Sequence, residues 1–377
     1  MEVTYIDLFG GAGGWSVGLE MAGWHGLGLY DWNASACKTS KGNFGFNVNQ
    51  IDLSDKKSLD CFEVKPLVVV GSPPCQGFSN EGYKDPNDSR NNLVWRFFDI
   101  IEMLNPSVWV FENVPGFSKS YGGKFYKLLV GRLEKMGYKW GSWILNAADF
   151  GVPQFRKRFI AIGSKKFNPM PPIPDHSDSE DLLGNKKYVT LWDAISDLPS
   201  VKCGERQGIF KYEKPPSSNY QKMIRDGSCL IHNHTTQSHS KRVLEKIQSV
   251  KPGQSMEVFI GKYQENKVAY AGGYRRALKW TPSWTAYWTR GMTSIHPEQD
   301  RFLSPRECAR IQSFPDKFIF YGTTIENYTQ ICNAVPPLMA KAIGIQLLSM
   351  LDKTYQKQNI LINKKNIKCS AKKFKSV

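Results

Sequence analysis

Short apolar runs alternate with segments of helical period through the first 165 residues. The runs have the length and composition of buried strands, and they lie at 5–9, 26–30, 67–70 and 108–111. A further short strand, more polar and ending in Asp52, is expected at 47–52. Apolar residues recur at helical spacing at 15–22, 91–104 and 125–136. A late hairpin-like pair of strands is expected at 143–147 and 159–163. This alternation predicts an α/β fold with a doubly wound, mostly parallel, Rossmann-like sheet.

The pattern changes after residue 166. Four prolines fall within 169–174, a linker composition, and residues 175–300 show no sustained period. Order returns at Ser304, where Pro305 and Glu307 complete the signature of a capped helix that we expect to run through Ile311. A long apolar helix is expected at 336–351. We therefore predict a main domain of residues 1–165 plus 323–352 and a smaller, loop-rich domain of residues 166–322.

The charge of the chain is strongly positive but uneven. The net charge is +16, and half of it lies in residues 353–377, which hold eight lysines and no acid. That segment is expected to be a basic, flexible tail. The remaining body is moderately basic, which favours a polyanionic partner.

The eight cysteines form no CxxC pair, and no Cys/His spacing resembles a metal site. The chain begins directly with a strand pattern, and no apolar run approaches a membrane-spanning length. These features predict a cytoplasmic protein with free thiols and neither a bound metal nor a membrane partner.

The strand at 67–70 leads into the most informative stretch. Its apolar run stops at Gly71, turns at Pro73-Pro74 and reaches Cys75. A thiol just past the carboxyl end of a buried strand lies where open α/β sheets hold their chemistry, so Cys75 is a candidate nucleophile. The alternative is a small buried cysteine beside a loop.

A glycine-rich turn, Gly10 to Gly14, joins the first strand to the first helix, as in cradles for nucleotide-like ligands. A plain tight turn is the alternative. Asp31 and Trp32 end the second strand, where an acid can hold ribose hydroxyls and an aromatic ring can lie against adenine. A solvated aspartate at a strand end would look the same.

Basic and aromatic residues interleave near the end of the loop-rich region, at Arg275, Arg276, Lys279, Trp280 and Trp284. This mixture suits phosphate contact and base stacking in a nucleic acid. An aromatic core with solvated charges at its edge is the alternative.

Six segments, in their order along the chain, resemble motifs of the DNA (cytosine-5) methyltransferase family of restriction–modification type. They are residues 7–14, 71–79, 111–114, 154–158, 301–307 and 333–337, and they span nearly the whole body. The chain is therefore identified as a member of that family. The resemblance makes the main domain the catalytic and cofactor-binding domain and the smaller one the target-recognition domain.

The resemblance implies methyl transfer to C5 of a cytosine flipped out of a specific duplex DNA sequence. Cys75 would add to C6, and a protonated Glu112 would donate to N3 while Asn113 supports that loop. Arg156 and Arg158 would bind the base O2, adjacent backbone or phosphate. Gln76 and Ser79 in the segment at 71–79 are expected at the DNA, as are Arg275 and Arg276 from the mixture of basic and aromatic residues. Residues 76–92, directly after the nucleophile, are expected to close over the flipped base as a lid, and a plain surface loop is the alternative.

The methyl donor implied by the resemblance is S-adenosyl-L-methionine. Its pocket would be lined by Phe9, Gly11, Gly13, Asp31, Trp32, Asp52, Pro74 and Asn333. The expected partner is double-stranded DNA, the family allows a restriction endonuclease for the same site, and a monomer is expected.

Two residues depart from the family pattern. Asp31 stands where glutamate is usual, and Cys332 replaces a glycine before Asn333, where a side chain would be strained if φ were positive. Three alternatives stay open: a transfer-RNA cytosine methyltransferase, although its Cys-Phe-Thr signature is absent; a DNA-binding homologue that has lost catalysis; and, on the glycine turn alone, a nicotinamide-dependent oxidoreductase.

Overall fold

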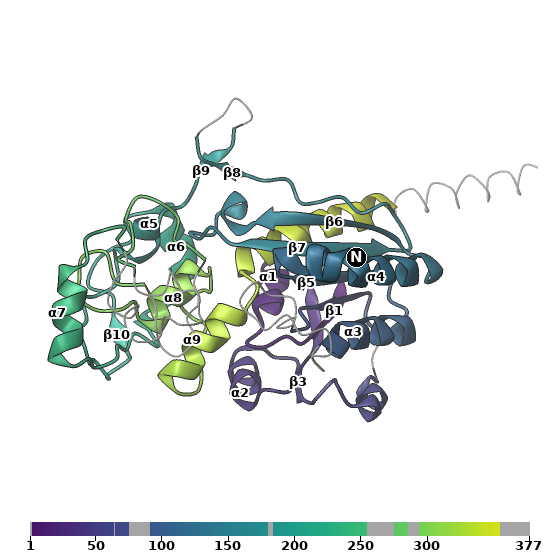
Figure 1. The fold of residues 1–377 in the computed structure, drawn as a ribbon, viewed down its shortest axis with the longest axis horizontal. Coiled ribbons are helices and arrows are strands. Elements are labelled where there is room, and N and C mark those ends of the chain that lie inside the picture. Colours follow the sequence, from purple (N-terminus) through teal and green to yellow (C-terminus); the bar gives the residue numbers. More distant parts are fainter. Residues whose placement is uncertain are drawn as a thin grey trace, which may run out of the picture.

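The computed structural model describes residues 2–63, 65–74, 91–179, 184–254, 275–285 and 294–354. Two parts lie side by side (Figure 1): a sheet covered by helices, and a smaller region of short elements that contains α5 to α8. The helix at 337–354 runs along the sheet region, although it comes last in the chain.

The described residues form a seven-stranded sheet in the order β3-β2-β1-β4-β5-β7-β6. Its strands are β1 (Thr4–Leu8), β2 (His25–Asp31), β3 (Asn47–Gln50), β4 (Val68–Gly71), β5 (Val108–Asn113), β6 (Lys139–Asn146) and β7 (Lys157–Ser164). All pairings among β1 to β5 are parallel, whereas β7 runs antiparallel to β5 and β6. The predicted fold class is confirmed, and so is the late antiparallel pair.

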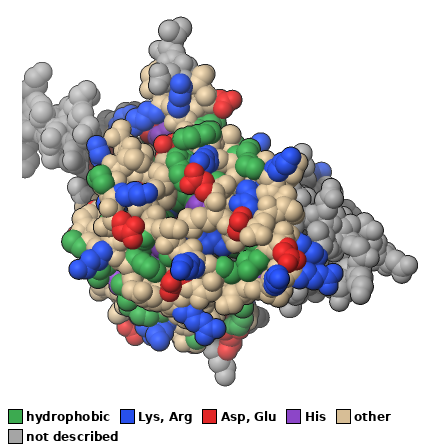
Figure 2. All heavy atoms as spheres, turned by 90° about the vertical axis from the view of Figure 1, so that its left-hand side faces the viewer, with side chains coloured by type: hydrophobic (Ala, Val, Ile, Leu, Met, Phe, Trp, Pro, Cys, Tyr) green, Lys and Arg blue, Asp and Glu red, His purple; other side chains and the backbone are tan. Residues whose placement is uncertain are grey.

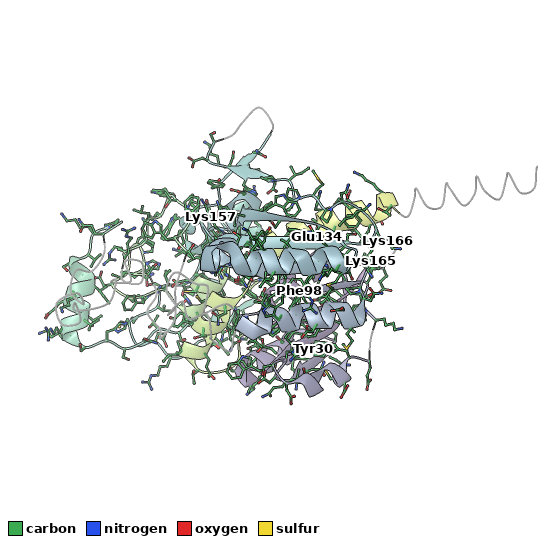
Figure 3. All side chains as sticks on the ribbon, turned by 45° about the vertical axis from the view of Figure 1, so that its right-hand side comes forward. Tyr30, Phe98, Glu134, Lys157, Lys165 and Lys166 are labelled. Carbon is green, nitrogen blue, oxygen red and sulfur yellow. The ribbon has the colours of Figure 1, made fainter. Side chains whose placement is uncertain are left out.

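Alternate residues of the central strands feed two cores. Val68, Val70 and Val110 face one side, with α1 (Gly14–Met21) and the helix at 337–354. Val69 and Phe111 face the other side, beneath α3 (Asn91–Leu104) and α4 (Lys124–Lys135). Figure 3 marks Phe98, a residue of α3 that belongs to this second core. Both faces of the sheet are covered, as the continuous apolar strands predicted.

Two glycines let α1 approach the backbone of the last helix. A Cβ atom at Gly14 would lie 2.2 Å from the Val335 carbonyl oxygen, and one at Gly18 would lie 2.3 Å from that of Pro337. Any side chain at either position would force the two segments apart. These glycines therefore bring the segment after Asn333 back to the first helix.

Several connections are short helical turns, and two described helices outside the loop-rich stretch at 175–300 have no counterpart in the sequence prediction. The turns are η1 (Lys56–Cys61), η2 (Pro115–Gly123) and η3 (Ala147–Phe150), and the unpredicted helices are α2 (Ala34–Asn43) and α9 (Thr324–Asn333). α2 is mostly polar, and α9 is short and separated from the last helix by Ala334 to Pro336. Neither has the long apolar period that marks a helix in sequence.

The smaller region is built from short elements, as predicted. They are β8 (His176–Ser177), β9 (Lys186–Lys187), α5 (Leu191–Ile195), β10 (Phe210–Lys211), α6 (Asn219–Arg225), β11 (Leu230–Ile231), α7 (Lys241–Ser249) and α8 (Pro305–Ile311). Ser304 and Glu307 form the predicted capping box of α8. The apolar core of the sheet continues into α5, α6 and α8, so the proposed domain boundary crosses a shared core. The division into domains remains a prediction.

One stretch, Thr324–Thr354, reaches the length and apolar composition of a membrane span, contrary to the sequence expectation. However, 61% of its most apolar window is buried inside the protein, as in the core helix of a globular protein. It is weak support for a membrane role.

Candidate active site

The candidate site lies at the edge where the parallel strands end. Because β1 to β5 are parallel, their carboxyl ends meet at one edge, and the strand order reverses between β1 and β4. Ligands of open α/β sheets bind outside such a reversal. Lys157 at the start of β7 and Lys165 just past its end mark the two edges of the sheet in Figure 3, and the Lys157 end lies toward the smaller region. The carboxyl ends of β1 to β5 lie at that same edge.

The glycine-rich turn leaves open space at one position. Phe9, Gly11 and Gly13 all have positive φ, at 54°, 54° and 86°. A Cβ atom at Gly11 would meet nothing within 4 Å, whereas one at Gly13 would lie 2.3 Å from the Phe44 ring. Gly13 is thus required by packing, and Gly11 leaves the backbone open to a ligand.

Asp31 ties the end of β2 to this turn. Its carboxylate accepts hydrogen bonds from the Gly11 N–H at 2.9 Å and the Asn33 N–H at 2.8 Å. The side chain is 8% exposed, and burial raises its pKa while these backbone donors oppose the rise. Trp32 beside it is 68% exposed and presents a ring face to solvent. A carboxylate, an aromatic face and an open glycine suit an adenosine-containing ligand.

The other predicted cofactor residues lie around the same edge. Asp52 follows β3, is exposed, and accepts the Ser54 N–H at 2.8 Å. Pro74 follows β4 and is partly exposed. Asn333 ends α9 with an exposed side chain, two residues before the carbonyl that contacts Gly14. The residues present fit the cofactor that the motifs imply.

The turn before the candidate nucleophile is held from two sides. The indole Nε1 of Trp15 donates to the Ser72 hydroxyl at 3.0 Å, and the Asn113 amide donates to the Pro73 carbonyl at 3.3 Å. The second contact is the support expected of Asn113. Cys75, Gln76, Ser79 and residues 76–90 of the predicted lid at 76–92 lie outside the described residues, and the last two residues of that stretch begin α3.

Glu112 and Arg158 form an ion pair beside this turn. The Arg158 Nε lies 2.9 Å from the Glu112 carboxylate, and both side chains are largely buried. The antiparallel pairing of β5 with β7 brings them together, because Glu112 lies opposite Ile160. A carboxyl group and a guanidinium therefore converge beside the turn that leads to Cys75.

Arg156 donates hydrogen bonds to backbone carbonyls, and backbone is one of the three partners that the sequence left open. It is 2% exposed, and its Nη2 donates to the carbonyls of Cys332 at 2.7 Å and Ala334 at 3.2 Å. Gln312 also donates to the Ala334 carbonyl, at 2.7 Å. Arg156 thus joins the start of β7 to the segment around Asn333.

Cys332 lies inside α9 and is not among the non-glycine residues with positive φ in the described chain. The strain considered for a side chain at this position is therefore absent. Its thiol is buried, while its carbonyl is the one bound by Arg156.

The prediction that Arg276 binds nucleic acid is wrong. Arg276 is 6% exposed and donates to the carbonyls of Ile247, Val250, His296 and Gln299 and to the Asp300 carboxylate. It therefore closes the carboxyl end of α7, where a cation is favoured. The neighbouring Arg275 differs: its guanidinium stacks on the Trp284 ring, 4.5 Å from the centroid.

Known proteins similar to this chain agree with the motifs. Residues 3–349 match the family model described as C-5 cytosine-specific DNA methylase. The Type II methyltransferase M.DdeI of Desulfomicrobium norvegicum is 33% identical, over 97% of this chain and 92% of that protein. M1.HphI of Haemophilus parahaemolyticus, also a Type II methyltransferase, is 35% identical, over 93% and 88%.

The chain belongs to the C-5 cytosine-specific DNA methylases. It is thus a DNA (cytosine-5) methyltransferase of the kind found in restriction–modification systems. The fold agrees: a crystal structure described as a prophage-encoded DNA modification methyltransferase from E. coli superposes with a TM-score of 0.76 at 25% identity, covering 93% of this methylase and all of that chain.

Sequence reasoning missed the contacts that hold this methylase's site together. The Trp15–Ser72 hydrogen bond and the backbone role of Arg156 join residues 57 and 176 positions apart. The spacing Gly14-x-x-x-Gly18 was a usable signal, because small residues four apart on a helix permit close approach of another backbone. No spacing signalled the other two contacts.

Proposed function

We propose that this methylase transfers a methyl group from S-adenosyl-L-methionine to C5 of a flipped-out cytosine in duplex DNA, through a covalent bond between Cys75 and C6. The observation that carries the proposal is the convergence at one sheet edge of three features. They are the open glycine turn with Asp31 and Trp32, the turn held by Trp15 and Asn113, and the Glu112–Arg158 pair.

In the proposed chemistry, the Cys75 thiolate forms a bond to C6, and the electron pair of the C5–C6 double bond moves into the ring. Once Glu112, the carboxylate paired with Arg158, has taken up a proton from solvent, it can donate a hydrogen bond to N3, where charge develops, with Arg158 beside it as a fixed positive charge. The C5 carbon then takes the methyl group, whose former bonding pair stays on the sulfur of the donor. The C5 proton passes to water as the C6–S bond breaks and regenerates the thiolate.

When bound, the cofactor supplies an electrophilic methyl group. Asp31 would hold its ribose hydroxyls, Trp32 and Phe9 its adenine faces, and Asp52 its adenine amino group. Gly11 would let the cofactor approach the backbone closely, and Gly13 would shape the turn. Pro74 and Asn333 would border the pocket.

The proposal assigns DNA recognition to residues 166–322 and DNA contacts to Gln76, Ser79 and Arg275, without Arg276. Figure 2 shows positive and negative side chains interspersed on the outer face of the smaller region, so this view presents no continuous basic surface among the described residues. We therefore place the DNA on the side that faces the sheet edge. A monomer in the cytoplasm, with a restriction endonuclease for the same site as its partner, completes the proposal.

The test is transfer of labelled methyl groups to duplex DNA, to the same duplex with 5-fluorocytosine, and to total transfer RNA. Label in the DNA and a covalent adduct on the fluorinated duplex are expected. Label confined to the RNA would overturn the proposed substrate, and DNA binding without any label would indicate a disabled homologue.

A pair of cysteine variants tests the nucleophile. Cys75→Ser should abolish both transfer and adduct formation, because the hydroxyl is a far weaker nucleophile at neutral pH. Cys229→Ser is the matched control, since that exposed thiol lies in the smaller region and its loss should change neither. Turnover near wild type in Cys75→Ser would remove Cys75 from the mechanism.

A further inference from the structure

We propose that Trp15 is a positioning residue for the nucleophile: its indole N–H fixes the Ser72 hydroxyl and thereby sets where Cys75 stands relative to the cofactor cradle. This inference rests on the proposed function. It adds a residue from the first turn of α1 to the machinery of the Cys75 turn.

The geometry at Ser72 is the basis of the inference. The Trp15 Nε1 donates to the Ser72 Oγ at 3.0 Å, and Trp15 is 2% exposed. The Ser72 N–H also donates to the Leu8 carbonyl, at 3.3 Å. Trp15 directly follows Gly14, the residue in closest contact with the Val335 backbone. One indole therefore connects the glycine cradle of α1 with the turn after β4.

The chain between Ser72 and Cys75 can transmit this constraint. Only Pro73 and Pro74 separate the two residues, and each proline ring fixes its φ near −65°. Few soft dihedral angles remain between the hydrogen-bonded hydroxyl and the cysteine. A displacement at Ser72 is therefore passed toward the thiol, and misplacement of about 1 Å can slow a reaction about a hundredfold.

The opposite side of the turn is held by a different element. Asn113, which follows the acid Glu112, donates to the Pro73 carbonyl. The turn is thus fixed from the cofactor side by Trp15 and from the acid side by Asn113. The second contact relates the turn to the strand that carries Glu112, and the first relates it to the glycine cradle.

The chain offers a matched control for the loss of an indole. Trp24 lies in the same core, just past the end of α1, and its Nε1 is buried with no hydrogen-bond partner among the described residues. Trp24→Phe therefore removes about the same volume as Trp15→Phe without removing a hydrogen bond.

The experiment measures the rate of covalent adduct formation on 5-fluorocytosine duplex, with separate titration of S-adenosyl-L-methionine. Trp15→Phe should slow the adduct about threefold to tenfold, the value of one net hydrogen bond, while cofactor affinity stays within about twofold. Ser72→Ala should slow adduct formation as much as Trp15→Phe does, whereas Ser72→Thr, which keeps a hydroxyl, should form the adduct at the wild-type rate. The double variant Trp15→Phe/Ser72→Ala should be no slower than either single variant. Trp24→Phe should form the adduct at the wild-type rate.

Three results would overturn the inference: an unchanged adduct rate in Trp15→Phe, multiplying effects in the double variant, or equal slowing in Trp24→Phe. The last would show a packing effect only. Failure of the wild-type protein to form any adduct would instead defeat the proposed function, and the inference with it.

Discussion

The sheet edge and the junction around α8 use the same types of charged residue for opposite purposes. The junction consists of Asp197, Arg301, Arg306, Glu307, Arg310 and Asp316. At the edge, Arg158 has one carboxylate partner, and Trp32 and Asn333 remain exposed. Around α8, Arg310 is fully buried and donates to the carboxylates of Asp197 and Asp316 and to the Ala194 carbonyl. Exposed side chains at the edge, such as Trp32, remain accessible to a ligand, whereas the charged groups at the junction are engaged by other groups of the protein.

The junction repeats this arrangement at two more arginines. Arg301 binds both carboxylate oxygens of Glu307, at 2.7 and 2.8 Å, and Arg306 donates to the carbonyls of His232, Pro315 and Phe318. Charged groups so far from water are costly unless every donor is engaged. The comparison teaches that a motif rich in arginine can be structural. The number of guanidinium donors that are hydrogen-bonded within the protein separates structural arginines from arginines available to a ligand.

The largest effect is expected from Arg310→Met, which removes the arginine that the buried carboxylates of Asp197 and Asp316 share. Unfolding free energy measured by urea titration should fall by about 3 kcal/mol, because loss of one member of a buried pair leaves buried charge less well compensated. Arg225→Met is the control. It removes a second arginine from Asp197 but leaves Arg310 in place, and its loss should be smaller. A fall below about 1 kcal/mol for Arg310→Met would mean that the junction does not carry the stability.

At the edge, Glu112→Gln should lower the rate of methyl transfer and leave stability nearly unchanged. The rate of methyl transfer should fall about a thousandfold, since a positioned acid contributes on that scale, while unfolding free energy changes by less than about 1 kcal/mol. Single-turnover kinetics and urea titration of the same sample supply the two readings. A large loss of stability with little loss of rate would place Glu112 with the structural charges.

The sequence predicted the fold well where local pattern decides it. Residues 91–104 form a helix with the bounds that their apolar spacing gave, and the capping box at Ser304 is present. Parallel pairing also followed from the continuous apolar strands, and with it the edge that gathers Asp31, Asp52 and Glu112. These features depend on neighbours in sequence or on the general rules of α/β sheets.

The roles of individual arginines could not be predicted in the same way. Arg275 and Arg276 are adjacent and chemically identical, yet one stacks on Trp284 and the other closes α7. Which one is buried depends on carbonyls supplied by residues 247, 250, 296 and 299. No sequence pattern reports such contacts, because they form only when distant segments pack.

A pH titration perturbs the junction less than the Arg310→Met substitution does. Burial lowers the pKa of His296 to about 4, and its Nδ1 accepts the N–H groups of Glu298 and Gln299. The ordinary pKa is 6.5, so between pH 6.5 and about 4 the imidazole of His296 is protonated in the unfolded chain and neutral in the folded chain. Stability should therefore fall as pH falls through this window, by about 3 kcal/mol from this residue.

His296→Asn keeps an acceptor near the position of Nδ1 but cannot take up a proton. Urea titrations between pH 4 and 8 should show a shallower loss for this variant than for the wild type. The buried His234, whose pKa burial also lowers, should account for part of the slope that remains. Identical slopes would show that His296 does not titrate in this range.

The smallest effect separates the two adjacent arginines. Arg275→Met should weaken binding to duplex DNA about fivefold and reduce the dependence of log affinity on log salt by about 1, as expected for one lost phosphate contact. Its unfolding free energy should change less than that of Arg276→Met, because Arg275 stacks on the Trp284 ring and is less buried than Arg276. Arg276→Met should lose about 3 kcal/mol of stability, because it leaves the carbonyls at the end of α7 without donors. If instead Arg276→Met lowered the salt dependence at unchanged stability, Arg276 would be a DNA contact, and the number of engaged donors would no longer separate structural arginines from those that reach the DNA.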